Sequence, residues 1–178
     1  EQAKGKGVTS VELFQELGDR YVDANRWDDA IASYTSAAEK DPSVWELIAE
    51  LELRQNRLEK AEAAWKKAIA AKDQALHHVG LGRVCLARKD TACAEKELDK
   101  ALTTATGEEV RESMEIAHFL GLLNRKADGL KLLESVSAEE EQVKNEALQL
   151  ATARLAKELG KTDLVKTACT RIAPVKCP

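Results

Sequence analysis

Small side chains recur at two positions along this chain, and their spacing constrains the fold more than any other feature of the sequence. The first position is occupied by Gly18, Ala49, Gly82, Ala117 and Ala153. The second position is occupied by Ala30, Ala61, Ala94, Gly129 and Val165. Members of the second series are 31, 33, 35 and 36 residues apart, a period typical of helical-hairpin repeats. Facing small residues let two antiparallel helices approach closely, so the sequence predicts a stack of five hairpins.

Two further series of residues follow the second position in register, and the first of them is mostly bulky. Four residues later stand Tyr34, Trp65, Leu98, Leu133 and Cys169, and three further on stand Ala37, Ala68, Ala101, Val136 and Ile172. In the first repeat, Phe14-x2-Leu17-Gly18-x2-Tyr21, then Ala30-x3-Tyr34-x2-Ala37 and Pro42, resembles the tetratricopeptide repeat. The resemblance extends over roughly 11–172. An ordinary helical bundle is the alternative, but amphipathic periodicity alone would not place small residues at both contact positions five times.

The resemblance implies an all-α fold, a right-handed helical solenoid of about five helix-turn-helix repeats, with protein binding as its function. We expect a flexible polar leader over 1–10, a solenoid over 11–173 and a short tail over 174–178. The expected repeats are 11–41, 42–72, 73–105, 106–136 and 138–173.

Local signals predict where some helices begin and end. Asp41 followed by Pro42 supplies an N-cap and a proline suited to the first helical position. Ser137 begins a capping-box spacing, from which a long helix over about 138–159 is expected. Gly160 can end that helix in a left-handed conformation.

Composition and motifs argue against several classes of function. The net charge is −4 and no basic patch is interleaved with aromatic residues, so we do not expect nucleic-acid binding. No apolar run approaches the ~18 residues of a membrane-spanning helix. The sequence has three histidines and no phosphate-binding loop, nucleophile elbow or HExxH motif, so we expect neither catalysis nor a cofactor.

The four cysteines indicate a compartment. Cys85 and Cys93 straddle one tight turn of the repeat frame, and Cys169 can reach Cys177 if the tail folds back. Two such disulfides would indicate an oxidising compartment, with a bacterial periplasm as the expected location. Two alternatives stay open: small buried thiols in a reduced, cytoplasmic protein, and a metal site that includes His78, although its spacing matches no standard zinc module.

In the tetratricopeptide family, the first helix of each repeat lines a concave groove. In the frame set by Gly18, the residue after the small position points toward that groove. This position, together with residues three or four positions away on the same helix, predicts the partner-binding residues. They are Asp19, Glu50, Leu76, Val79, Arg83, Met114, His118 and Arg154. The groove is then acidic near the N-terminus and apolar to basic from the third repeat. The alternative is that these charges face solvent or contact neighbouring repeats.

An apolar groove with arginines suits a protein or peptide partner that carries carboxylates, since arginine can hold a carboxylate with two parallel hydrogen bonds. The sequence therefore predicts a non-enzymatic adaptor, expected within a bacterial envelope assembly. Two other functions remain open. One is an interaction domain of a larger enzyme or signalling protein, and the other is a module that associates end to end with its own copies.

Overall fold

The computed structural model describes residues 10–105, 110–139 and 142–172. Within these ranges the chain forms ten α-helices and one short 3-10 helix, with no strand. None of the described helices is long and apolar enough to cross a membrane. The chain divides into two compact units between Asp73 and Gln74. The predicted all-α class is confirmed.

Unit 1 consists of two helical hairpins. Its elements are α1 (Ser10–Asp23), α2 (Trp27–Ala38), η1 (Pro42–Val44), α3 (Trp45–Arg54) and α4 (Leu58–Ala71). Helix α1 pairs with α2 and α3 pairs with α4, while α2 also packs on η1 and α3. Tyr34 and Trp65, the bulky residues of the repeat pattern, are 3% and 2% exposed. Asp41 caps η1 as predicted, because its side chain accepts a hydrogen bond from the Ser43 backbone N–H at 3.0 Å.

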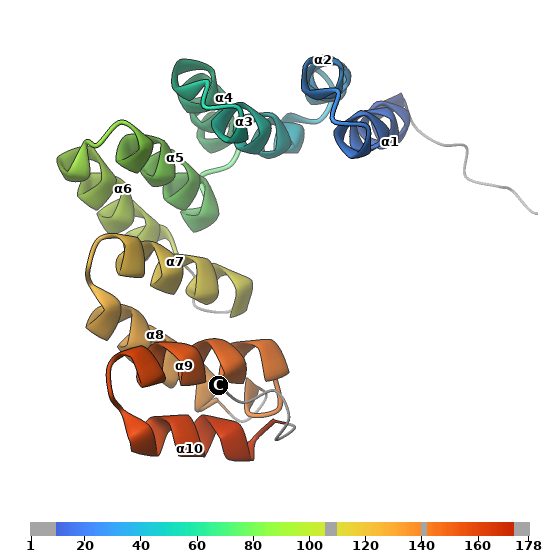
Figure 1. Ribbon diagram of the computed structural model, residues 1–178. Coiled ribbons are helices and arrows are strands. Elements are labelled where there is room, and N and C mark those ends of the chain that lie inside the picture. The colour runs from blue at the N-terminus through green and yellow to red at the C-terminus, as the bar shows by residue number, and fades with distance from the viewer. Residues whose placement is uncertain (1–9, 106–109, 140–141, 173–178) are drawn as a thin grey trace, which may run out of the picture. The chain divides into compact units, whose positions relative to one another are not determined.

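Unit 2 consists of three consecutive hairpins, and each hairpin pairs one helix with the helix that follows it (Figure 1). Its helices are α5 (Ala75–Ala87), α6 (Thr91–Thr104), α7 (Val110–Leu122), α8 (Lys126–Ser137), α9 (Glu146–Glu158) and α10 (Thr162–Thr170). One apolar cluster joins α5, α6 and α7 around Leu98 and Phe119. A second cluster joins α7, α8 and α9 around Ala117, Leu133 and Leu148. Each hairpin is therefore held by its own helix pairing and by contacts with a neighbouring hairpin of the unit.

The small residues of the repeat pattern lie where helices come closest. A Cβ atom added at Gly129 on α8 would lie 2.8 Å from the carbonyl oxygen of Ala117 on α7. One added at Gly18 on α1 would lie 2.6 Å from Cδ1 of Tyr34 on α2. Real Cβ contacts are longer than this, so the small residues at these two positions permit the observed packing.

The same backbone turn ends the first helix of every hairpin. A residue with positive φ stands at each turn: Asn25, Asn56, Lys89, Asn124 and Gly160. The N–H of the next residue then donates to the carbonyl five residues earlier, at 2.8 to 2.9 Å. This is the Schellman arrangement, which satisfies carbonyls left free at a helix end. The prediction for Gly160 is confirmed, and four further turns repeat the geometry with asparagine or lysine.

The long helix predicted over 138–159 is wrong. Ser137 is the last residue of α8 rather than the start of a helix, and α9 begins at Glu146 after an N-cap at Asn145. The fully buried Gln149 explains the turn between them. Its side-chain amide nitrogen, Nε2, donates to the backbone carbonyls of Ser137 and Gln142, at 3.2 and 3.3 Å. These bonds hold a bend that a continuous helix would remove.

Candidate partner-binding site

The predicted groove residues fall in both units. Asp19 and Glu50 belong to unit 1. Unit 2 contains the other six, namely Leu76, Val79, Arg83, Met114, His118 and Arg154.

In unit 1, Asp19 has a structural contact. Its carboxylate accepts a hydrogen bond from the Tyr34 hydroxyl at 2.5 Å, which joins α1 to α2. Burial, followed by this bond to a carboxylate, raises the pKa of Tyr34 well above its usual range. Glu50 lies half-buried on α3. A role for either acid in partner binding stays a prediction.

In unit 2, three of the predicted residues meet at one pocket of about 380 Å³ between α7, α8 and α9. Met114 and His118 come from α7, and Arg154 comes from α9. The pocket is also lined by Ala117, Gly121, Leu122, Lys126, Leu133, Ala151, Leu155 and Glu158. Sequence reasoning therefore found part of this site, and it missed the contribution of α8.

The floor of the pocket is apolar and firmly held. Ala117 and Leu133 are 2% and 3% exposed and belong to the core between α7 and α8. Met114, Ala151 and Leu155 pack against that core while remaining partly exposed. Because these side chains are parts of the packed core, the floor exists before any ligand arrives.

The rim of the pocket is polar and mostly basic. Arg154 and His118 are exposed, and Arg154 forms no ion pair or hydrogen bond with any residue in the described part of the chain. By contrast, Lys126 Nζ lies 2.7 Å from Glu158 Oε2, so these two charges largely offset each other. Among the described residues that line the rim, Arg154 is thus a cation that no carboxylate balances.

The α5 side of unit 2 differs from the predicted arrangement. Arg83 Nη2 lies 2.6 Å from Glu115 Oε2 on α7, so its charge is already partly balanced within the protein. Leu76 is partly buried on α5. Val79 is 2% exposed and packs in the core with Leu98 and Phe119. A partner cannot reach Val79, and its placement in the groove is corrected.

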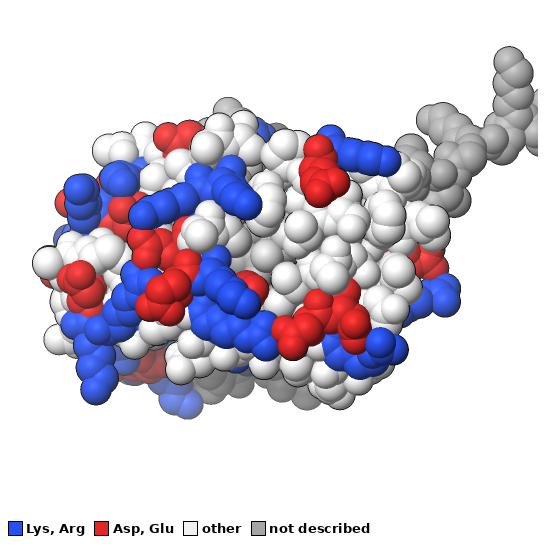
Figure 2. Space-filling model, turned by 90° about the horizontal axis from the view of Figure 1, so that it is seen from above, with Lys and Arg blue, Asp and Glu red and all other residues white. Residues whose placement is uncertain are grey.

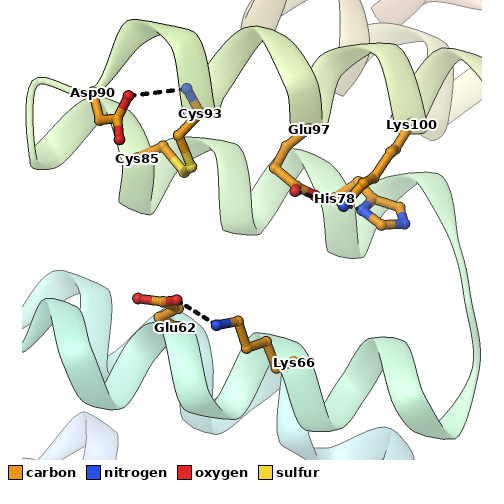
Figure 3. Close-up of a disulfide and its surroundings, with 8 residues drawn as sticks. All are labelled: Glu62, Lys66, His78, Cys85, Asp90, Cys93, Glu97 and Lys100. Atoms are coloured by element: carbon orange, nitrogen blue, oxygen red, sulfur yellow. Dashed lines mark hydrogen bonds and ion pairs between the residues drawn. A yellow bond between two sulfur atoms is a disulfide. The ribbon is translucent and has the colours of Figure 1, made fainter.

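The predicted Cys85–Cys93 disulfide is confirmed (Figure 3). It joins the end of α5 to the start of α6 with a Cα–Cα distance of 5.7 Å. Asp90 caps α6 beside it by accepting a hydrogen bond from the Cys93 N–H at 3.0 Å. The bond removes both thiols from the alternative metal site. Cys169 is also disulfide-bonded, but Cys177 lies outside the described residues, so the second pairing stays a prediction.

A buried polar network that the sequence did not predict lies along the same hairpin (Figure 3). His78 Nδ1 on α5 is 2.7 Å from Glu97 Oε2 on α6, and Lys100 Nζ is 2.7 Å from Glu97 Oε1. His78 and Glu97 are 4% and 6% exposed. The pairing satisfies a carboxylate that would be costly to bury alone. Within the described ranges, no group of three or more His, Cys, Asp or Glu side chains could hold a metal ion.

Charges of both signs mix on the face of the molecule drawn in Figure 2, with an uncharged area among them. This agrees with the small net charge of −4.

Comparison with known proteins supports the repeat assignment. The family model described as "Tetratricopeptide repeat" matches residues 16–75 and 47–109, which together span more than half of the chain. A search of curated protein sequences finds no match.

Solved structures of similar fold share little sequence with this chain. TTC0263, a thermophilic TPR protein of Thermus thermophilus, has a TM-score of 0.62 at 15% identity, covering 90% of this chain and 87% of its own. YrrB, described as a TPR protein with an unusual peptide-binding site, has a TM-score of 0.52 at 14% identity, covering 93% and 88%. Yeast Tom70 has a TM-score of 0.68 at 15% identity, covering 93% of this chain and 37% of its own. These likenesses establish the fold alone.

Proposed function

Because this chain belongs to the tetratricopeptide repeat family, we propose that it is a non-catalytic adaptor that binds a peptide segment of a partner protein at the α7–α9 pocket. The family fold is an interaction fold, which makes binding the expected activity. The pocket is where residues predicted from the repeat frame lie together on an apolar floor. The bound segment would place an apolar side chain on that floor and a carboxylate beside Arg154.

The observation that carries this proposal is that Arg154, which pairs with no carboxylate among the described residues, lies above a preformed apolar surface. A guanidinium group holds a carboxylate with two parallel hydrogen bonds, which fixes the orientation of the ligand as well as attracting it. A pocket of about 380 Å³ lies at the small end of the range for ligand sites, so it suits one or two side chains of a peptide. The peptide-binding site in the description of YrrB is consistent with this use of the fold.

Selection of displayed random peptides on the immobilised protein tests the proposal. Enriched sequences should place Asp or Glu within a few residues of a large apolar residue. They should be lost when the selection is repeated on Arg154→Glu, and kept on Lys157→Glu, which changes a charge on the same helix outside the pocket. Enrichment of basic peptides, or equal enrichment on both variants, would contradict the proposed ligand.

We further propose that the adaptor works in an oxidising compartment, within a bacterial envelope assembly. The Cys85–Cys93 disulfide supports this, because such bonds persist mainly outside the reducing cytoplasm. Protein from the native host should be denatured without reductant, alkylated and weighed intact. No alkylated cysteine is the expected result. Four alkylated cysteines would favour a cytoplasmic adaptor instead.

A further inference from the structure

Two leucines on α1 are exposed although the repeat pattern assigns them to an interface. Leu13 is 57% exposed and Leu17 is 38% exposed. One repeat later, the same two positions are occupied by Val44 and Ile48, which are 1% and 4% exposed. Val44 lies in η1 and Ile48 lies in α3, and α2 packs onto both of these elements. The second helix of one repeat therefore covers this face of the next repeat.

The hairpins inside unit 2 follow the same rule. The equivalent positions on α7 are Glu112 and Ile116, and those on α9 are Leu148 and Thr152; all four are at most 8% exposed. Helix α6 packs against α7, and α8 packs against α9. On α1, by contrast, this face is exposed at Leu13 and Leu17 in the described part of the chain.

We propose that the Leu13–Leu17 face of α1 docks an amphipathic helix of a partner protein that carries basic residues beside its apolar stripe. The partner helix would pack on α1 in the same way that α2 packs on η1 and α3, and so would continue the stack of helices. The buried residues of α2 are mostly small (Ala30, Ser33, Ala37 and Ala38), so a partner helix with a small-residue stripe could approach α1 equally closely.

The charges of α1 define the flanks of this partner. Helix α1 carries the acids Glu12, Glu16, Asp19 and Asp23 and a single base, Arg20. Arg20 is paired with Glu16 at 2.7 Å, and Asp19 accepts a hydrogen bond from Tyr34, while four acids and one base give the helix a formal charge of −3. Lysine and arginine beside the docked stripe would therefore be attracted to it, and an acidic helix would be repelled.

A second copy of the chain fits this face poorly. The exposed side chains of α10 at the other end are polar, and they include Lys166, Thr167 and Thr170. The apolar side chains Leu164 and Val165 of α10 are only partly exposed, so they offer a limited surface for end-to-end stacking on Leu13 and Leu17. A two-fold contact between α1 and its copy would bring two acidic helices together.

Photo-cross-linking in the native host tests the proposal. A photoreactive amino acid is placed at Leu13 in the full-length protein and, as a matched control, at Leu47, which is 40% exposed on α3 of the same unit. The Leu13 probe should capture a peptide that reads as a Lys/Arg-flanked amphipathic helix of another protein. A peptide from a second copy, a peptide from the same polypeptide, or equal capture at Leu47 would overturn the proposal.

The captured peptide, once synthesised, gives a quantitative test in solution. Leu13→Glu combined with Leu17→Glu should weaken its binding by at least ~10-fold, while Leu47→Glu changes it less than ~2-fold. Arg154→Glu should leave this binding unchanged, which separates the α1 face from the α7–α9 pocket. Equal affinity of the parent and the double variant would overturn the proposal, provided that the double variant melts like the parent.

Discussion

Lys89 turns the chain after α5 in a left-handed backbone conformation, with φ of 62°. The equivalent turns use asparagine or glycine, which tolerate this conformation better than a lysine does. We therefore expect Lys89→Gly to stabilise the protein by about 0.5–1 kcal/mol. The midpoint of urea unfolding should rise, while the slope of the unfolding free energy against urea concentration stays unchanged.

The reverse change at Gly160 is the control. An added Cβ there meets nothing within 4 Å, so Gly160→Ala tests backbone strain alone. It should lower stability by about 1 kcal/mol. If Lys89→Gly lowered stability as well, the strain assigned to this turn would be wrong.

Tyr34 should make stability fall at alkaline pH. Its pKa in the folded protein is raised above 10.0 by burial and by the bond to Asp19. The resulting stabilisation is complete below the unfolded pKa and is lost as the pH rises through the folded pKa. Above pH 10 the free energy of unfolding should thus fall more steeply for the parent than for Tyr34→Phe. Urea unfolding at several alkaline pH values measures these slopes.

The other tyrosine provides the control for this effect. Tyr21 is partly exposed, and its ring lies 4.5 Å from the Arg26 guanidinium carbon. Tyr21→Phe should retain the steep alkaline loss seen in the parent. Identical slopes for the two variants would show that Tyr34 does not carry the effect.

Among the elements, the α7–α8 hairpin depends on a missing side chain. The nearest atom to a Cβ at Gly129 is a backbone oxygen, which cannot rotate away as a side chain could. Gly129→Ala should therefore cost about 1–3 kcal/mol. Gly121→Ala on α7 is the matched control, because a Cβ there meets nothing within 4 Å and alanine favours the helix. Equal stability of the two variants would refute the close approach at Gly129.

The α5–α6 hairpin is also joined covalently, across a sequence separation of 8 residues. Removing the bond with Cys85→Ala and Cys93→Ala should cost about 2–3 kcal/mol, mainly because the unfolded chain gains freedom. Chemical unfolding measures the loss, and the parent under reductant separates the bond from the packing of the buried Cys85. A double variant as stable as the oxidised parent would contradict this estimate.

The helices were largely predictable because their pattern is repeated. Small residues at Gly129 and Ala117 marked both sides of one hairpin contact, and similar pairs marked the others. The turn between α8 and α9 was not predictable, because it depends on Gln149 reaching the carbonyls of Ser137 and Gln142 across the bend. Nothing in the local sequence distinguishes a glutamine that makes such bonds from one that faces solvent.

The candidate site was predictable only in part, for a similar reason. His118 and Arg154 share one repeat position, so the frame assigned both to the groove, and the structure places both at the pocket. The frame gave no sign that Arg83 pairs with Glu115, because that contact joins side chains 32 residues apart. It also misplaced Val79, since one helical step separates a core position from a groove position.

At the scale of the whole molecule, the two proposals assign opposite charge preferences to a surface in each unit. The pocket between α7 and α9 presents a cation, and α1 presents an acidic helix. One adaptor could thus hold an acidic segment at one surface and a basic helix at the other. Each surface lies within a single unit, so each can be tested independently of how the units are placed.

The most direct test of the central claim is a charge swap at the pocket, measured by calorimetric titration. The test uses two peptides from the selection that differ at one position, where one has Glu and the other has Lys. Each is titrated into the parent, Arg154→Glu and Lys157→Glu. The parent and Lys157→Glu should bind the Glu peptide at least ~10-fold more tightly, which corresponds to about 1.4 kcal/mol. Arg154→Glu should lose or reverse this preference. An unchanged preference in Arg154→Glu would contradict the α7–α9 pocket as the peptide-binding site.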